Sequence, residues 1–411
     1  MALLLMCVST LHAGSATVVW ISIDGFRHDY LRRVQPPTLS RLAKEGAFTT
    51  LERPIFPSLT FPNHAAQVTG TYVDHTGIPS NTFLDTATGQ SYNLPDQQAV
   101  LRDEPIWVTA KRQGLRVAVI DWPMSHAQSG EWKSDYFDEK FDMKRSDQER
   151  IDQVVQMLKI ESVKKTQPPL RLVITYLAHI DTIGHRNGPD SKELDQAVRE
   201  ADETIGGLLK TVIEWFDGAH SVESGDDLYV IVTTDHGMEP TKTLVNLDRA
   251  IGVDLVSGAK ILTSACLADV YLTDVPAEQR AARVDQILAK LKPLEYLKAW
   301  RASDVPPEFH FADPTRAGDV IVLLAPGYAY TTERNSTTRP TTANRQGNHG
   351  YDPAVCPNMF GTAIVWRYRQ PLGGIDLGPV DNTQWHATVA KLLGIERAAG
   401  SDPRVISLER R

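Results

Sequence analysis

The chain has 411 residues and a formal net charge of −8, with 42% apolar and 23% charged residues, as in ordinary globular proteins. This length allows one large α/β domain, or a main domain with a smaller insert. The negative charge argues against a nucleic-acid scaffold and against a protein that binds anionic membranes. It does not exclude a small phosphate substrate, because bound metal ions would dominate the local field.

Residues 2–11 form a short apolar run that is followed by small residues up to Ala16. The run is too short to span a bilayer and is typical of a signal peptide, here over residues 1–16. The usual positive residues before the run are missing, so a frayed N-terminus is the alternative. No later segment is long and apolar enough to cross a membrane. We therefore expect an exported protein, periplasmic or secreted.

Cysteine usage leaves two readings of the exported chain. Cys7 would be removed with the signal peptide, and Cys266 and Cys356 would remain as an even pair. An oxidising compartment could join them in a disulfide, and two buried free thiols are the alternative.

The apolar run at residues 228–232 is followed by Thr-Thr-Asp-His-Gly at 233–237. β-Branched, nearly unbroken runs are typical of parallel strands that are buried on both faces. Asp235 and His236 therefore stand at the carboxyl end of a strand, which is where open α/β sheets build their sites. Alone, the pair could also be a strand end followed by a polar loop.

The first predicted strand, residues 17–23, ends directly before Asp24. An Asp-Gly pair after a strand is usually a turn. Asp24 becomes a candidate metal ligand because its strand is expected to lie beside the one that carries Asp235. A helix is predicted over residues 31–46.

Thr60 lies in the stretch Pro-Ser-Leu-Thr-Phe-Pro-Asn-His at residues 57–64, before a predicted helix. Pro62 suits the first turn of that helix. Thr60 could be the N-cap, or its hydroxyl could be a nucleophile that faces a phosphate at the helix N-terminus. Asn81, in the loop that follows the helix, could donate a hydrogen bond to a phosphoryl oxygen or could close a turn.

The buried strand at residues 170–177 runs into a polar segment that carries Asp181 and His185. These two residues are four apart, so one helical turn or a tight loop could aim both at one cation. Farther on, residues 326–348 form a long polar loop that leads to His349. Such a histidine is often only a loop residue, but its glycine neighbours also free the imidazole to reach a metal.

The order of the elements predicts an α/β fold with a mainly parallel sheet. Residues from about 240 to 330 look α+β and are expected to form an insert or cap. The main sheet is expected to end with a strand at 361–367 and a helix at 383–393.

Three aspartates and three histidines make up the candidate metal ligands: Asp24, Asp181, Asp235, His185, His236 and His349. Mixed nitrogen and oxygen ligands suit zinc better than magnesium or calcium. Six protein ligands exceed one tetrahedral site and divide into two sites with open positions. Two such ions, roughly 4 Å apart, can clamp the attacking and leaving oxygens of an in-line displacement.

These residues belong to longer motifs, found in this order along the chain: Ser-Ile-Asp-Gly-Phe at 22–26, Leu-Thr-Phe-Pro-Asn-His at 59–64, Val-Thr-Gly at 68–70, His-Thr-Gly-Ile at 75–78, Asp181 to His185, Thr-Asp-His-Gly-Met at 234–238 and Gly-Asn-His-Gly-Tyr at 347–351. In this set and order the chain resembles the nucleotide pyrophosphatase/phosphodiesterase family of the alkaline phosphatase superfamily. The resemblance implies an alkaline-phosphatase-like αβα sandwich over residues 17–395, followed by a C-terminal tail at 396–411.

The same resemblance implies two zinc ions per chain, one held by Asp181, His185 and His349 and the other by Asp24, Asp235, His236 and Thr60. Thr60 would be the nucleophile and Asn81 a phosphate-binding amide. Phe61 and Tyr176 fall where the family places aromatics that sandwich a nucleobase or leaving group. The implied reaction is hydrolysis of a phosphodiester or pyrophosphate bond through a phospho-threonine intermediate. The partner is then a small phosphodiester or nucleotide, without a stable nucleic-acid complex.

Two alternatives remain open. Some similar proteins hydrolyse phosphocholine-bearing lipids or phosphonates, and a choline pocket needs a cage of aromatic and carboxylate side chains. The segment 122–147 offers candidates for such a cage: Trp122, Trp132, Tyr136 and Asp138. The other alternative is a non-catalytic binding protein. A binding protein of this kind would be expected to lack a metal ligand or the nucleophile, and this sequence contains all of these residues.

Diesters are expected to be preferred over monoesters. No Lys or Arg lies between Ile55 and Asp74, the segment around Thr60. An enzyme specialised for monoesters usually meets their extra charged oxygen with an Arg fork or a third cation. An arginine that is distant in the sequence, Arg27 or Arg345 for example, could still fold into the site.

Overall fold

The computed structural model describes residues 16–164, 168–219, 225–333, 336–341 and 345–409, so the expected signal peptide lies outside it up to residue 15. Its centre is a nine-stranded sheet whose strands, in spatial order, are β19 (Ile375–Asp376), β2 (Ala47–Arg53), β18 (Gly361–Arg367), β8 (Asp227–Thr233), β1 (Ala16–Ile23), β7 (Leu170–Leu177), β5 (Arg116–Ile120) and β6 (Tyr136–Phe137), with β20 (Val380–Asp381) paired to β2. Strand β18 is antiparallel to both its neighbours, and the other pairings of this sheet are parallel.

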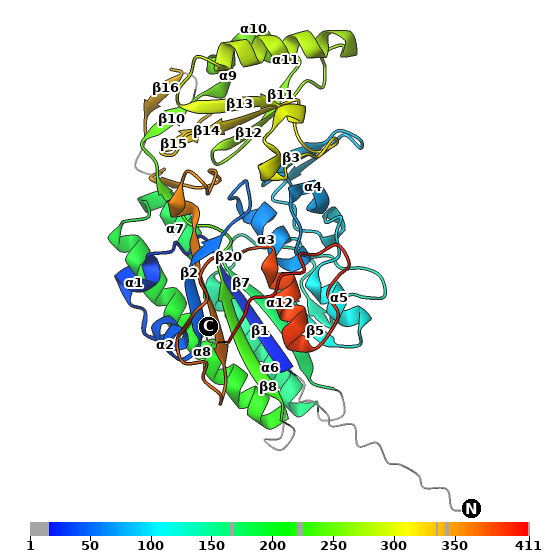
Figure 1. Ribbon diagram of the computed structural model, residues 1–411, viewed down its shortest axis with the longest axis vertical. Coiled ribbons are helices and arrows are strands. Elements are labelled where there is room, and N and C mark those ends of the chain that lie inside the picture. The colour runs from blue at the N-terminus through cyan, green and yellow to red at the C-terminus, as the bar shows by residue number, and fades with distance from the viewer. Residues whose placement is uncertain (1–15, 165–167, 220–224, 334–335, 342–344, 410–411) are drawn as a thin grey trace, which may run out of the picture.

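Helices cover both faces of this sheet (Figure 1). One face carries α1 (Tyr30–Val34), α2 (Pro37–Glu45), α6 (Asp147–Val163), α7 (His179–Asn187) and α8 (Lys192–Ala219), and the other carries α3 (Thr60–Thr69), α5 (Ile106–Arg112) and α12 (Gln384–Leu393). Val19 and Ile21 of β1 pack into the first layer, whereas Val18 and Trp20 pack into the second. Because both faces are buried, the strand is apolar throughout. The predicted αβα sandwich is confirmed.

A smaller α+β unit, at the top of Figure 1, is built on a four-stranded antiparallel sheet. Its strands are β11 (Lys260–Ser264), β12 (Leu267–Tyr271), β14 (Val320–Leu324) and β13 (Leu297–Arg301), and its helices are α9 (Leu247–Ile251), α10 (Val253–Val256) and α11 (Ala277–Leu291). A three-stranded sheet beside it consists of β15 (Tyr328–Tyr330), β10 (Thr243–Val245) and β16 (Thr338–Pro340). The apolar core of the α+β unit also contains Phe56 and Leu59, from the segment that leads into α3, and Tyr351. The unit therefore shares an apolar core with the segment around the start of α3.

Two local features differ from the sequence prediction. The helix expected over residues 31–46 is divided into α1 and α2, because Gln35 adopts a left-handed conformation (φ 51°) before Pro36 and Pro37. Residues 47–53, for which no strand was expected, form β2 between β18 and the short strands β19 and β20.

The remaining expectations about the chain as a whole concern its C-terminus, cysteines and membrane segments. The segment after α12 packs back on the domain, where the Asp402 N–H donates to the Gly70 carbonyl (2.8 Å) and Ile406 joins the core. Cys266 and Cys356 are buried and free. Within the described ranges, no helix combines the length and the apolar character that a bilayer crossing requires.

Helix α2 begins without a side-chain cap of its own, since Pro36 occupies the N-cap position. Its first free N–H groups are bound instead by Asp202 of α8, a side chain that is 2% exposed. The carboxylate accepts from the Thr38 N–H (2.9 Å) and from the Leu39 N–H (2.7 Å). One buried anion thereby joins two helices of the same layer and satisfies a helix N-terminus.

We expect Asp202→Ala to lower the free energy of unfolding by about 1–3 kcal/mol, because it leaves buried helix N–H groups without an acceptor. The matched control is Glu203→Ala at the exposed neighbouring position, which should stay within about 0.5 kcal/mol of wild type. Urea denaturation of the three proteins measures the difference. Equal midpoints for both variants would show that Asp202 contributes nothing to this junction.

Candidate active site and metal centre

The carboxyl ends of β7, β1 and β8 meet at one edge of the sheet, because β1 is paired in register with both of its neighbours. Asp24 follows β1 directly, and Asp235 follows β8. Asp181 lies in the first turn of α7, the helix that comes after β7. Three carboxylates from distant parts of the sequence are thus brought to one place by strand pairing.

The first group of possible metal ligands consists of Asp24, Asp235 and His236, whose ligand atoms all lie within 4.8 Å of one another. His236 Nε2 is 3.1 Å from Asp235 Oδ2 and 3.5 Å from Asp24 Oδ1. All three side chains are buried, and the Gly25 N–H donates to Asp235 Oδ1 (3.1 Å). This group agrees with the second ligand set that the resemblance implied.

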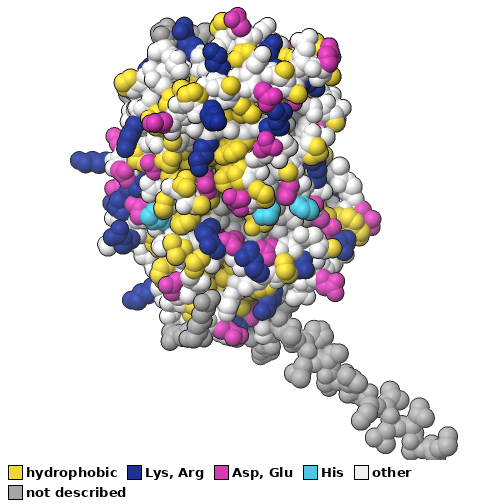
Figure 2. Space-filling model, turned by 45° about the horizontal axis from the view of Figure 1, so that its top comes forward, with side chains coloured by type: hydrophobic (Ala, Val, Ile, Leu, Met, Phe, Trp, Pro, Cys, Tyr) yellow, Lys and Arg dark blue, Asp and Glu magenta, His cyan; other side chains and the backbone are white. Residues whose placement is uncertain are grey.

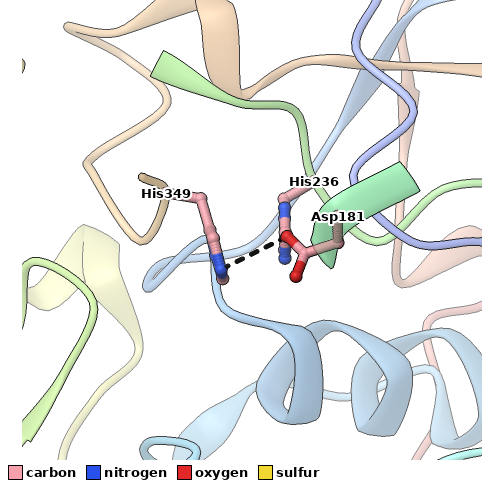
Figure 3. Close-up of side chains that lie close together, drawn as sticks. All are labelled: Asp181, His236 and His349. Atoms are coloured by element: carbon pink, nitrogen blue, oxygen red, sulfur yellow. Dashed lines mark ion pairs between the residues drawn. The ribbon is translucent and has the colours of Figure 1, made fainter. Parts of the chain in front are cut away.

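The second group consists of Asp181, His236 and His349 (Figure 3). Asp181 Oδ1 is 3.7 Å from His349 Nε2, and the rings of His236 and His349 are stacked with centroids 3.6 Å apart. His185, which was expected here, lies at its edge: its Nε2 is 3.4 Å from Asp181 Oδ2 and 3.1 Å from His349 Nε2. The two groups are therefore contiguous, with His236 between them.

These side chains are arranged as ligands for cations. Three buried carboxylate oxygens, Asp24 Oδ1, Asp181 Oδ1 and Asp235 Oδ2, have no hydrogen-bond partner within the described part of the chain. The Nδ1 atoms of His185, His236 and His349 each lie against a backbone carbonyl, of Gly347 (3.0 Å), Gly237 (2.9 Å) and Ser58 (2.9 Å) respectively. Such contacts orient the ring and leave Nε2 with a free lone pair for a metal. The residues present fit divalent ions with mixed nitrogen and oxygen ligands, as zinc prefers.

Burial explains the protonation states that these groups would have without a cation. It raises the pKa of Asp235 to about 7, and it raises the pKa of Asp24 well above the usual range together with the charge of Asp235. Burial also lowers the pKa of His236 to about 3, so its ring is neutral. Without a cation, the imidazoles are neutral and the carboxyl groups cannot all be ionised. Bound positive charge would allow the carboxyl groups to ionise together.

Thr60 is the first residue of α3, and the N-cap position belongs to Leu59, which provides no side-chain cap. The Thr60 hydroxyl is therefore not a helix cap. Oγ1 lies 3.2 Å from His236 Nε2, beside the first group of ligands, and the residue is 8% exposed. Behind it, His64 Nδ1 lies 2.9 Å from the Thr60 carbonyl oxygen. The positive end of the α3 helix dipole makes this a favourable place for an anion.

Asn81 and Tyr176 are held by hydrogen bonds that define what they can offer. Asn81 Oδ1 accepts from the Phe61 N–H (3.0 Å), which leaves the amide NH₂ group to donate into the site. The Tyr176 hydroxyl donates to Asp24 Oδ2, so its polar end orients a candidate metal ligand. The Tyr176 ring lines the cavity described next and lies 6.4 Å from the ring of Phe141.

A cavity of about 490 Å³ opens in front of Thr60, Phe61 and Asn81. Its walls include side chains that the sequence did not single out, namely Leu94, His126, Phe141, Met143, Lys144 and Arg145. Most of these come from the irregular segment 122–147, whose mixture of aromatic and charged residues indicates a substrate wall but does not say which residues face it. On the face shown in Figure 2, basic and acidic side chains are interspersed around the hollowed middle.

The four residues considered for a choline cage do not line this cavity. Trp122 is buried in the core, and Trp132 is 39% exposed. The Tyr136 hydroxyl donates to Glu161 (2.6 Å). Asp138 belongs to a third carboxylate–histidine group, with Asp121 and His126. Here arginine side chains supply the positive charge in place of a metal ion, since Asp121 Oδ2 pairs with Arg145 (2.8 Å) and Arg150 (3.0 Å).

A mainly parallel sheet between two helical layers, with carboxylate and imidazole ligands gathered at its carboxyl edge around a threonine, defines an alkaline-phosphatase-like, metal-dependent hydrolase. The chain belongs to the type I phosphodiesterase / nucleotide pyrophosphatase family, whose family model matches residues 18–352. The family and the hydrolase class that the sequence predicted are confirmed.

Individual relatives agree with this assignment. An uncharacterized pyrophosphatase/phosphodiesterase of Schizosaccharomyces pombe is 29% identical over 92% of this chain and 77% of its own length. The bis(5'-adenosyl)-triphosphatase ENPP4 of Bos taurus is 29% identical over 84% of this chain and 71% of its own. Among solved structures, human ectonucleotide pyrophosphatase/phosphodiesterase 5 has a TM-score of 0.78 at 22% identity, covering 94% of this chain and 97% of its own. An inactive murine form in complex with AMP has a TM-score of 0.77 at 20% identity, covering 95% and 97%.

Proposed function

We propose that the protein is an exported two-zinc phosphodiesterase and nucleotide pyrophosphatase with Thr60 as its nucleophile. The observation that carries this proposal is the Thr60 hydroxyl, which is not used as a helix cap and lies 3.2 Å from His236 Nε2. One zinc ion would be held by Asp24, Asp235 and His236, and the other by Asp181, His185 and His349, with His236 adjoining both groups. When bound, such ions lower the pKa of a hydroxyl and offset the charge of phosphoryl oxygens.

The protein's own residues then divide the reaction among them. Thr60 Oγ1 attacks the phosphorus and forms a phospho-threonine while its proton passes to solvent. The alcohol or phosphate on the opposite side leaves with the bonding electrons. The Asn81 NH₂ group donates to a phosphoryl oxygen, and so does the Thr60 N–H at the start of α3. A water molecule then attacks the phospho-threonine from the vacated side and regenerates the Thr60 hydroxyl.

The nucleotide part of the proposal relies on the cavity and on the relatives. Phe61, Tyr176 and Phe141 give a nucleoside apolar surface beside the phosphate position. A related murine structure is described in complex with AMP, and a related bovine protein is named as a bis(5'-adenosyl)-triphosphatase. We therefore infer that the cavity accepts a nucleoside 5'-phosphate whose phosphorus lies at Thr60. Phe61 and Tyr176 stay proposed substrate contacts.

We expect the purified protein to contain two zinc ions per chain and to lose activity on chelation, because three buried carboxylate oxygens otherwise lack partners. Elemental analysis combined with an activity assay tests this. Asp235→Asn should lose at least one ion. Asp138→Asn, in the group already filled by Arg145, is the control and should keep both. Fully active protein without any transition metal would contradict the proposal.

Thr60→Ala should reduce turnover of diesters by several orders of magnitude, since the attacking oxygen is removed. The fold should be intact, because the N-cap of α3 is Leu59. Thr60→Ser restores a hydroxyl and should retain part of the activity. Thr69→Ala, at the other end of the same helix, is the matched control with turnover close to wild type. Near wild-type hydrolysis by Thr60→Ala would make water the direct nucleophile.

Diesters should be preferred over monoesters because the donor beside the phosphate position, Asn81, is neutral. Arg27 is engaged by Asp29 (2.6 Å) and Asp190 (2.5 Å) and does not line the cavity, while Arg145 is paired with Asp121. The two arginines that line this cavity, Arg145 and Arg150, are both paired with Asp121, and Arg345 does not line it, so no unpaired arginine fork faces a second charged oxygen there. The measurement is the ratio of kcat/KM for an aryl nucleotide diester to that for the matching aryl phosphate. A ratio below one would overturn this assignment.

A further inference from the structure

A second cavity adjoins the site. Its volume is about 370 Å³, and it shares Asn81, His185 and His349 with the first cavity. Thr60 and Asp24 line the first cavity and do not line the second. The two cavities therefore meet at Asn81 and at the imidazoles of His185 and His349, which gives a bound substrate two directions in which to extend.

The position of the nucleophile assigns these two directions, if the proposed function holds. In phosphoryl transfer the attacking and leaving oxygens lie roughly in line on opposite sides of the phosphorus. If Thr60 Oγ1 attacks from its place beside His236, the second cavity, which Thr60 does not line, is the space that can receive the leaving oxygen beyond His185 and His349. The nucleoside occupies the first cavity, where Phe61, Tyr176 and Phe141 provide apolar surface.

The charges of the two cavities differ. The first contains acidic residues, among them Asp96 and Asp147, together with its basic side chains. The second is lined, as far as the described residues go, by no carboxylate, and its one permanently charged side chain is Arg345. Arg345 forms no ion pair within the same ranges. A cavity with an unpaired guanidinium and no anion favours a negatively charged occupant.

The position of Arg345 is maintained by contacts that leave most of its guanidinium free. One nitrogen, Nη1, donates to the Tyr330 carbonyl (2.8 Å). The next residue is anchored to the metal-ligand helix α7, since the Gln346 N–H donates to the His185 carbonyl (2.8 Å). A guanidinium carries five N–H donors, so the remaining ones can bind phosphate oxygens.

Neutral donors complete the wall. Thr263 and Asn348 line the second cavity, and so does Thr241, which is 5% exposed. The Thr241 hydroxyl is buried without a hydrogen-bond partner in the described part of the chain. Together with Arg345 these groups match the oxygen-rich surface of a phosphate chain better than they match an aromatic or alkyl group.

We propose that the second cavity receives the leaving group and that Arg345 selects leaving groups that carry phosphate. For a nucleoside triphosphate, the bond from Thr60 Oγ1 to the α-phosphorus forms while the bond from that phosphorus to the bridging oxygen breaks. The bonding pair leaves with pyrophosphate, whose charge Arg345 compensates, and the Thr60 proton passes to solvent. Water then releases the nucleoside monophosphate. This inference depends on the proposed function and adds the chemical class of the leaving group.

The test compares two substrates with the same nucleoside: ATP, which loses pyrophosphate, and the p-nitrophenyl ester of AMP, which loses a phenolate. Arg345→Gln should lower kcat/KM for ATP by about tenfold or more and that for the aryl ester by no more than about twofold, because the charged contact is made only by the phosphate chain. Arg345→Lys keeps the charge and should recover most of the loss. Arg32→Gln removes an exposed charge on α1, outside both cavities, and should leave both substrates unchanged.

Binding gives a second readout that does not depend on turnover. In zinc-loaded Thr60→Ala protein, calorimetric titration should show that Arg345→Gln weakens ATP binding by about tenfold and AMP binding by less than about twofold, because AMP does not reach the second cavity. Equal weakening of ATP and AMP, or unchanged ATP binding, would overturn the inference while the proposed function stands. A wild-type enzyme that hydrolyses neither ATP nor the aryl ester would overturn the proposed function, and the inference with it.

Discussion

Three carboxylates, two of them buried, meet at one edge of a sheet and repel one another, and the rest of the site is arranged around that repulsion. The pairing of β1 with β7 and β8 sets Ser22 opposite Tyr176 on one side and Thr233 on the other, so the residues that follow these strands converge. Burial disfavours the ionised form of each carboxyl group. The unpartnered oxygens and the neutral imidazoles that face them are the features expected of a site that is complete only with bound cations.

The segments that bring Thr60 and His349 to this edge come from opposite ends of the chain and hold each other. The Ser58 hydroxyl donates to the Tyr351 carbonyl (2.6 Å), and the Ser58 carbonyl lies against His349 Nδ1 (2.9 Å). Between them Gly350 has φ 93°, and a Cβ there would meet the Leu59 side chain at 2.8 Å. A larger residue would separate the two loops, so the glycine allows Thr60 and His349 to lie along one buried wall.

The wall of the first cavity is fixed by charge rather than by regular structure. Asp121, fully buried, pairs with Arg145 and Arg150 and lies 3.1 Å from His126 Nε2. Arg150 in turn lies over the ring of Phe141, with its central carbon 5.2 Å from the ring centroid. An irregular segment that would otherwise sample many conformations is thereby held against the substrate position. The cost of burying these ions is offset by their mutual pairing.

The sequence by itself determined where strands end in candidate metal ligands. An unbroken apolar run indicates a strand that is buried on both faces, and the residue after the run stands next to it in the chain. Asp24, Asp235 and His236 were found in this way, and the motifs identified the family. Only the tertiary structure decided that Thr60 is not a helix cap, that Tyr176 donates to Asp24, and that Phe141 and Arg345 face the two cavities. Strand β2 was missed for the same reason: its seven residues carry too little pattern alone, and its place is set by pairing with β18. Local sequence reports burial, whereas which distant residues meet depends on register and packing across the fold.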